Sequence, residues 1–255
     1  MKTIALLPAR LASARLPEKM LADLCGKPLI VRTWEAVVAT GLFHEVLIVT
    51  DHSRILEAAQ AHGAQVCLSR PDHPSGSDRL AEVVAARPDV DVVVNVQGDE
   101  PFTSKQSLSA LLACFNDPLV QVASACCRLE TWSDYQNPNV VKVVKDVQGD
   151  ALYFSRAPIP FDRDQVMDTA AEQPQGLAFT AWQHLGLYAY RREALLRFTS
   201  LPPAPIELTE KLEQLRLLHH GMRIRMAEVT EKAVGVDTAA DLEKARALFT
   251  SRAGK

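Results

Sequence analysis

Short runs of apolar and β-branched residues alternate with segments of helical periodicity along the first half of the chain. The apolar runs predict strands at residues 4–7, 46–49, 66–68, 92–96 and 120–125. The segments between them predict helices at residues 29–40, 53–62, 78–86 and 104–115. This alternation is typical of βαβ units around a mainly parallel sheet. The sequence therefore predicts an α/β fold that binds its ligands outside the carboxyl ends of the strands.

The pattern changes after Asn137-Pro138-Asn139, where apolar runs at 140–145 and 151–154 predict a hairpin or meander. The polar, proline-containing segment 158–175 is typical of a lid or of a mobile loop. The remaining elements are expected in the order strand 183–190, helix 192–198, helix 207–220, strand 224–229 and helix 239–248. A chain of 255 residues fits one large α/β domain with an insertion, or two small lobes.

The composition excludes several classes of protein. A net charge of -3 gives no basic field that would attract nucleic acid or an anionic membrane. The first strand is expected at residues 4–7, so close to Met1 that we expect no signal peptide. No apolar run approaches the ~20 residues of a spanning helix. The five cysteines show no metal-ligand spacing and suit a reducing compartment. We therefore expect a cytoplasmic protein with no nucleic acid partner and no membrane insertion.

The loop behind the first strand carries three cations, Arg10, Arg15 and Lys19, and two prolines stiffen it. Because it follows the carboxyl end of a buried strand, it is placed to bind a polyanion such as a triphosphate. The alternative is a solvated basic loop. Neither the dinucleotide-binding pattern G-x-G-x-x-G nor a P-loop is present, so nucleotide binding would depend on this loop.

Two carboxylates follow separate strands. Asp99 lies in Gln97-Gly98-Asp99-Glu100-Pro101, and Asp237 lies in Gly235-Val236-Asp237-Thr238. Mg²⁺ takes one or two carboxylates together with substrate oxygens, so this pair beside phosphate-binding cations suits a magnesium-dependent phosphoryl transfer site. The alternatives are a simple turn residue for Asp99 and a helix N-cap for Asp237.

Other polar residues allow two interpretations each. His184 and Tyr188 share one face of a strand, with Gly186 between them, and either bind a ligand or pack in the core. Ser75 to Ser77 open a helix as a cap, as ligands of a nucleotide, or as both. Asp51 and Ser53 are expected as N-caps. Glu213 and Gln214 are neighbours on a helix and cannot point the same way.

An ordered set of motifs extends these observations over nearly the whole chain. The segment from Ala9 to Lys19 has the form A-R-x-x-S-x-R-L-P-x-K, and it resembles the signature of the sugar-activating cytidylyltransferases. Within these enzymes the chain is most similar to the group that uses 3-deoxy-manno-octulosonate (Kdo). The further matching segments are 24–28, 49–51, 75–79, 96–101, 137–142, 151–156, 184–188, 212–216 and 235–238.

The resemblance implies a fold and an activity. The fold is the Rossmann-like nucleotide-diphospho-sugar transferase fold, a mainly parallel mixed sheet with helices on both faces and a small β-rich dimerisation or lid insertion. One domain would span 1–250, with a nucleotide-binding half at 1–130, a sugar-binding, lid and dimerisation part at 131–222, a return to the core at 223–250 and a tail at 251–255. The activity would be transfer of CMP from CTP to Kdo, for lipopolysaccharide biosynthesis, with Mg²⁺ as cofactor, by a homodimer.

The resemblance also assigns roles to residues. Asp99 and Asp237 would hold the metal, and the catalytic residues would be Arg10, Arg15, Lys19 and Asp99. The nucleotide would be bound by Pro8, Ala9, Arg10, Arg15, Lys19, Ser69, Arg70, Ser75, Gly76, Ser77, Arg79, Gln97 and Asp99. The sugar acid would be bound by Arg15, Gln97, His184, Tyr188, Glu213 and Gln214.

Three alternatives remain at this stage. The acceptor is Kdo, its 8-amino form or a sialic acid, or the chain is a catalytically inactive nucleotide-binding regulator. The presence of both Asp99 and Asp237 argues against the regulator. For the homodimer, we expect an exposed aromatic surface around Trp132 and Tyr135.

Overall fold

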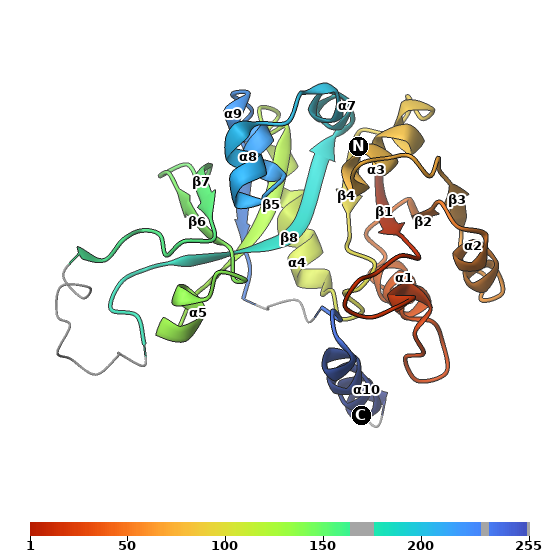
Figure 1. Cartoon of the computed structure of the whole chain (residues 1–255). Coiled ribbons are helices and arrows are strands. Elements are labelled where there is room, and N and C mark those ends of the chain that lie inside the picture. Colours follow the sequence, from red (N-terminus) through yellow and green to blue (C-terminus); the bar gives the residue numbers. More distant parts are fainter. Residues whose placement is uncertain (164–175, 231–234, 254–255) are drawn as a thin grey trace. The chain divides into compact units, whose positions relative to one another are not determined.

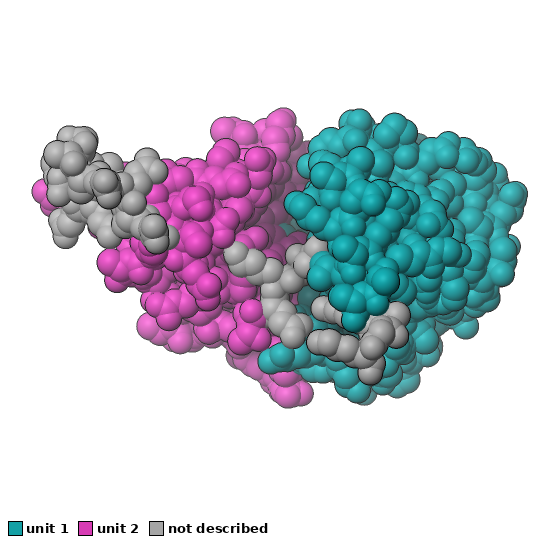
Figure 2. All heavy atoms as spheres, turned by 90° about the horizontal axis from the view of Figure 1, so that it is seen from below, with its two compact units in different colours: residues 1–109, 187–199, 233–255 teal, residues 110–186, 200–232 magenta. Residues whose placement is uncertain are grey.

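The computed structural model of the protein describes residues 1–163, 176–230 and 235–253 (Figure 1). These residues form two compact units, which Figure 2 distinguishes by colour. Unit 1 comprises residues 1–109, 187–199 and 233–255, and unit 2 comprises residues 110–186 and 200–232. The division of the chain by role, predicted at residues 130 and 222, stays a prediction.

The sheet of unit 1 confirms the predicted parallel core. Its strands are β1 (Thr3–Ala9), β2 (Glu45–Thr50), β3 (Val66–Leu68) and β4 (Val92–Asn95), which pair in parallel in the order β3-β2-β1-β4. The last residues of β8 (Trp182–Arg191) pair antiparallel with β4, which makes the sheet mixed. Side chains of β1 and β4 are almost all buried, as their continuous apolar sequences require.

Helices cover this sheet and close the unit. They are η1 (Lys19–Leu21), α1 (Leu29–Ala39), α2 (Ser53–Gln60), α3 (Gly76–Ala85), α4 (Lys105–Ala113), which continues into unit 2, α7 (Arg192–Ser200) and α10 (Ala239–Ala253). Leu242 and Ala245 of α10 pack with Leu24 and Leu29, so the last helix is anchored on the beginning of the chain. Helix α10 continues through residues 251–253, which the sequence analysis placed in a tail.

Unit 2 contains the predicted hairpin and a second group of strands. Strands β6 (Lys142–Lys145) and β7 (Ala151–Ser155) pair antiparallel, and β6 also pairs with the first residues of β8. Strands β5 (Val122–Arg128) and β9 (Arg225–Glu228) pair in parallel. The helices are η2 (Cys114–Asn116), α5 (Trp132–Gln136), α8 (Pro205–Glu210) and α9 (Gln214–His219).

The single helix predicted at 207–220 is wrong. The chain breaks between α8 and α9 at Lys211, which has a left-handed φ of 54°. The guanidinium of Arg156 donates to the carbonyl oxygens of Glu210 at 2.7 Å and Lys211 at 3.4 Å. The Arg156 guanidinium thus replaces the helical partners of these two carbonyls and allows a turn that the local sequence does not predict.

The exposed aromatic surface predicted around Trp132 and Tyr135 is also wrong. Their side chains are 8% and 1% exposed, and they pack with Leu129 and Ala181. The Tyr135 ring lies 5.3 Å from Trp132 and 5.2 Å from Phe179, in tilted and edge-on contacts that are favourable for aromatic rings. The two side chains are thus core residues of unit 2.

Two further expectations concern the lid and the membrane. Residues 164–175 of the predicted lid lie outside the described residues, and the described beginning of this segment is held by the Tyr135 hydroxyl, which donates to the Pro160 carbonyl at 2.5 Å.

Within the described part of the chain, none of the helices has the length and hydropathy of a membrane-spanning segment.

The turn after β4 tests how tightly unit 1 is packed. A Cβ added to Gly98 would lie 2.8 Å from Cδ1 of Ile30 and 3.0 Å from the carbonyl oxygen of Pro8. We expect Gly98→Ala to lower the free energy of unfolding by about 1–3 kcal/mol, because overpacking forces the neighbours apart. Urea denaturation measures this change.

The matched control is Gly76→Ala, since a Cβ there meets only Pro8 side-chain atoms at ordinary distances of 3.6 and 3.7 Å. Its free energy of unfolding should stay within about 0.5 kcal/mol of the parent value. Equal stabilities of the two variants would contradict the packing described for Gly98.

Candidate active site

Lys19 joins three distant parts of the chain at the carboxyl edge of the unit 1 sheet. Its ammonium makes an ion pair with Asp99 and lies 3.0 Å from Oδ1 of Asp237. A guanidinium nitrogen of Arg15 lies 3.0 Å from the same Asp237 oxygen, in a second ion pair. The Lys19 side chain is 12% exposed, whereas that of Arg15 is 67% exposed. The structure therefore brings together both predicted carboxylates and two of the three predicted cations.

The turn after β4 and the turn before α10 aim the carboxylates. The carbonyl of Gly98 accepts a hydrogen bond of 2.8 Å from the buried Thr33 hydroxyl, and the amide of Val236 donates to the Asp99 carbonyl at 2.9 Å. Thr238, not Asp237, caps α10, since its hydroxyl accepts from the Asp241 amide. Asp237 is thereby left to face Lys19, and the alternative of an N-cap is excluded for it.

Charges in this cluster are strongly coupled. Burial, together with the charges of Asp99 and Asp237, raises the pKa of Glu100 to about 7. Burial alone would lower the pKa of Lys19, but the hydrogen bonds and charges of Asp99 and Asp237 outweigh it and raise that pKa. Lys19 is therefore held as an ammonium between two carboxylates.

The donor set fits a magnesium ion. The two carboxylates converge on one position, where the Lys19 ammonium lies. Within the described residues, no group of three or more His, Cys, Asp or Glu side chains could surround a metal ion. Mg²⁺ needs no such cage, because it commonly takes one or two carboxylates and completes its coordination with substrate oxygens and water.

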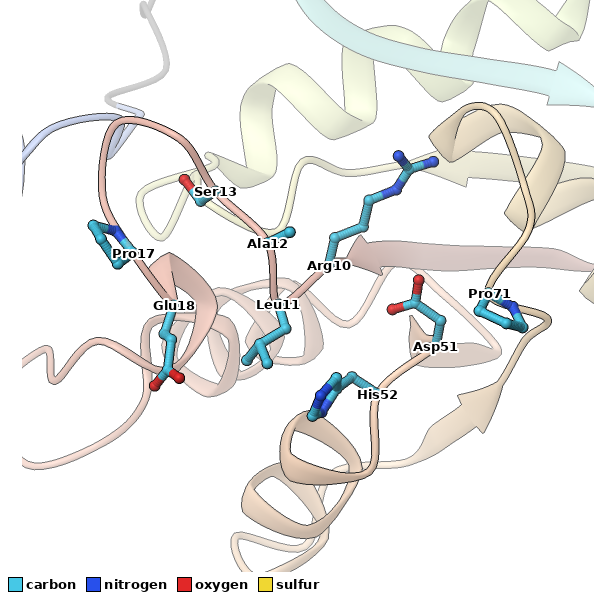
Figure 3. Close-up of a pocket in the computed structure, with 9 residues that line it drawn as sticks. All are labelled: Arg10, Leu11, Ala12, Ser13, Pro17, Glu18, Asp51, His52 and Pro71. Carbon is cyan, nitrogen blue, oxygen red and sulfur yellow. The ribbon is translucent and has the colours of Figure 1, made fainter.

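Arg10 lies apart from this cluster, on the wall of a cavity. Its guanidinium donates to the carbonyl of His73 at 3.0 Å. The cavity, of about 590 Å³, is lined by Arg10, Leu11, Ala12, Ser13, Pro17, Glu18, Asp51, His52 and Pro71 (Figure 3). It opens beside the ends of β1 and β2, where an α/β sheet binds its ligand.

The predicted nucleotide residues after β3 lie around the beginning of α3. Ser75 caps this helix, its hydroxyl accepting from the Asp78 amide while the Asp78 carboxylate accepts from the Ser75 amide. Gly76 lies beside Pro8, Ser77 is buried, and Gln97 follows β4. The Arg70 side chain is 66% exposed. The capping role of Ser75 is thus real, and it does not exclude nucleotide binding.

Asp51 does not cap α2. His52 does, because its ring accepts from the Arg54 amide at 3.2 Å, so the N-caps predicted at Asp51 and Ser53 are wrong. Oδ2 of Asp51 instead accepts from Arg79 at 2.7 Å, and the Arg79 side chain is completely buried. No local pattern marks this contact between residues 28 positions apart.

In unit 2, His184, which is predicted to bind the sugar acid, lies in a polar network. Its Nε2 lies 2.9 Å from the Ser124 hydroxyl, its Nδ1 lies 3.5 Å from Nε2 of Gln214, and the Phe154 ring packs edge-on at 4.9 Å. Burial lowers the pKa of His184 to about 3, so the ring is neutral. Gln214 is the buried first residue of α9, and Glu213 is its N-cap residue. Sequence reasoning missed Ser124.

Tyr188, further along β8, belongs to unit 1. It pairs with Asn95 across the strands, and its ring stacks on Tyr190 at 6.0 Å. Residues two positions apart on a strand lie on the same face, which allows this stacking.

Comparison with known proteins agrees with this architecture and with its motifs. The sequence profile of the family described as Cytidylyltransferase matches residues 4–224. A protein of Flavobacterium johnsoniae named 3-deoxy-manno-octulosonate cytidylyltransferase is 48% identical over 98% of this chain and 99% of its own length. A protein of the same name from Geobacter metallireducens is 45% identical over 96% of each chain. The chain therefore belongs to the cytidylyltransferase family.

A solved structure agrees with both the fold and the family. It is that of CMP:2-keto-3-deoxy-manno-octonic acid synthetase complexed with CTP. This synthetase is 39% identical to the chain, and the two superpose with a TM-score of 0.90 over 99% of this chain and 100% of the synthetase. The predicted family and the predicted α/β fold are confirmed.

The buried imidazole of His184 generates a prediction for stability. Its pKa is lowered from 6.5 to about 3 in the fold, so below pH 6.5 the unfolded chain binds more protons than the native protein. The contribution of the buried, neutral imidazole to the free energy of unfolding is therefore complete above pH 6.5, and it falls as the pH is lowered toward 3. We expect His184→Gln to flatten the fall in the free energy of unfolding, measured by urea denaturation at several pH values.

The exposed His62 provides the control. His62→Gln should keep the pH dependence of the parent protein. If His184→Gln kept it too, His184 would not be the buried neutral group described above.

Proposed function

We propose that this protein transfers CMP from CTP to the anomeric hydroxyl of Kdo, giving CMP-Kdo and pyrophosphate. The observation that carries the proposal is the convergence of Asp99 and Asp237 on Lys19, in a chain 48% identical to a relative named for this activity. This arrangement suits a reaction in which the transferred group carries negative charge and protein cations hold it.

Asp99 and Asp237 would hold Mg²⁺, which would neutralise phosphate oxygens and so favour attack at the α-phosphorus. Lys19 lies between them and would bind the phosphates that leave as pyrophosphate, together with Arg10. Arg15, which is largely exposed, would orient the α-phosphate and the carboxylate of the sugar acid. Catalysis would then depend on position and charge, without a protein base.

We assign the cytidine to the ends of β1 and β4 and the beginning of α3. The exposed and half-buried residues in this region would contact the cytidine. The buried residues would shape the pocket that holds it. The full set is Pro8, Ala9, Ser69, Arg70, Ser75, Gly76, Ser77, Arg79 and Gln97.

We assign the sugar acid to Arg15, Gln97, His184, Tyr188, Glu213 and Gln214. The neutral His184 supports this assignment, since it orients the Gln214 amide without adding a charge. A homodimer, a cytoplasmic location and a part in lipopolysaccharide biosynthesis also belong to the proposal, and the family resemblance supports them.

Pyrophosphate release from CTP tests the function and the acceptor together. Kdo, its 8-amino form and a sialic acid are offered in parallel with magnesium present. We expect release with Kdo and little with sialic acid. Turnover faster with the 8-amino form would change the acceptor and keep the chemistry, whereas no release with any acceptor would overturn the proposal.

The two carboxylates can be tested one at a time. Asp99→Asn and Asp237→Asn should each lower kcat by about 10²-fold or more, because each removes a charge from the reaction centre. Circular dichroism should show the parent fold. The control is Asp89→Asn, an exposed carboxylate paired with Lys2, which should keep the parent kcat. Normal magnesium-dependent turnover in either site variant would remove that residue from the metal site.

The two substrates can be separated kinetically. Gln214→Ala should raise KM for Kdo much more than KM for CTP, by an amount equivalent to about 1–3 kcal/mol, because a hydrogen-bonding partner is left unpaired. Lys19→Ala should act mainly on CTP. If Gln214→Ala changed both constants equally, α9 would be a packing element and the acceptor site would lie elsewhere.

A further inference from the structure

The loop between β3 and α3, residues 69–75, carries three of the residues assigned to the nucleotide and lies on the surface. The side chains of Arg70 and Asp72 are 66% and 72% exposed. Such a loop is a poor platform for recognition unless something fixes it, since loops are more mobile than the elements they connect. The structure contains a set of contacts that fixes its beginning and its middle.

The first contact is the buried guanidinium of Arg79. One of its nitrogens donates to the Ser69 hydroxyl at 2.5 Å and another donates to Asp51 Oδ2 at 2.7 Å. Arg79 is 0% exposed, so its charge depends on Asp51, the one carboxylate with which it forms an ion pair among the described residues. A planar, two-pronged cation of this kind holds its partners in a fixed geometry.

The second contact comes from Glu82, one turn further along α3. Its Oε2 accepts from the Arg70 amide at 3.0 Å and lies 2.5 Å from Nε2 of His73. The carbonyl of His73 in turn accepts from Arg10 at 3.0 Å. The helix therefore holds the beginning and the middle of the loop, and the loop holds a residue assigned to the triphosphate.

Asp51 occupies the central position in this arrangement. It follows β2 directly, so its carboxylate is fixed to the sheet, and it joins the sheet to α3 through Arg79. Figure 3 shows the same carboxylate on the wall of the cavity that Arg10 and Pro71 also line. Without its charge, Arg79 would be left buried and uncompensated, which is costly enough to move the loop.

We propose that Asp51 and Glu82, acting through Arg79 and the backbone of residues 69–73, are positioning residues that set the nucleotide loop for CTP. The proposal rests on the proposed function, because it assigns the loop to CTP. It predicts an effect on one substrate only: the loop is held for CTP, and Kdo is assigned to other residues.

The chain offers a matched control for Asp51. Glu45, the first residue of β2, pairs with Arg87, which follows α3, so this ion pair joins the same strand and helix at their other ends. The side chains of Glu45 and Arg87 are 27% and 29% exposed, so this ion pair is partly buried. Glu45→Gln removes a carboxylate charge, as Asp51→Asn does. The ion pair that it breaks also joins β2 to α3, but it lies away from the loop.

The experiment compares Asp51→Asn, Glu82→Gln and Glu45→Gln in the pyrophosphate assay and in thermal unfolding with and without CTP. We expect Asp51→Asn to raise KM for CTP about tenfold, in line with the cost of a slightly misplaced binding group. Glu82→Gln should raise it in the same direction. KM for Kdo should change less than about twofold in both, and CTP should raise Tm less than in the parent protein.

Glu45→Gln should keep the parent KM values and the parent rise in Tm with CTP. If it matched Asp51→Asn, or if Asp51→Asn raised both KM values equally, Asp51 would support the fold only and the proposal would fail. If Asp51→Asn did not fold, Glu82→Gln would decide in the same way. No pyrophosphate release by the parent protein would overturn the proposed function, while the effect of CTP on Tm would still test the loop.

Discussion

The ammonium of Lys19 holds together two carboxylates from distant parts of the chain, those of Asp99 and Asp237. Two carboxylates this close repel one another unless a cation lies between them. One of the two follows β4 and the other lies 218 residues from Lys19, so the chain has to return to the first sheet after unit 2. The packing of α10 on Leu24 and Leu29 provides that return. The charges of Lys19 and Arg15 thus offset those of the two carboxylates at this edge of the sheet.

The second organising charge is Arg79, and it differs from the ion pairs at the surface. An exposed pair such as Lys2 with Asp89 contributes little to stability, because water competes for both charges. Arg79 has no such competition, so the loss of one partner would leave an uncompensated charge in the interior. A buried pair of this kind specifies geometry, and here the geometry is that of the loop before α3.

Two buried polar side chains of unit 2, those of His184 and Lys142, are satisfied by hydrogen bonds within the unit. His184 is neutral because burial disfavours its protonated form, and Ser124 and Gln214 lie at its two ring nitrogens. Lys142, also buried, donates to three backbone carbonyls, those of Asn137, Val140 and Arg156. Arg156 then supports the turn between α8 and α9, and this turn is what separates Glu213 and Gln214 from α8.

The amino-acid sequence was enough to predict the strands of the core, the mainly parallel α/β class and the turns that carry Lys19, Asp99 and Asp237, because short apolar runs and the residues that end them act over a few positions. It did not determine the break at Lys211, the burial of Trp132 and Tyr135, or the partner of Asp51. Each of these depends on a group far away in the chain: the Arg156 guanidinium, the Phe179 ring and the Arg79 guanidinium. These three features depend on tertiary structure, because a side chain can exchange water or a helix cap for a buried partner only after folding has brought that partner within hydrogen-bonding or packing distance.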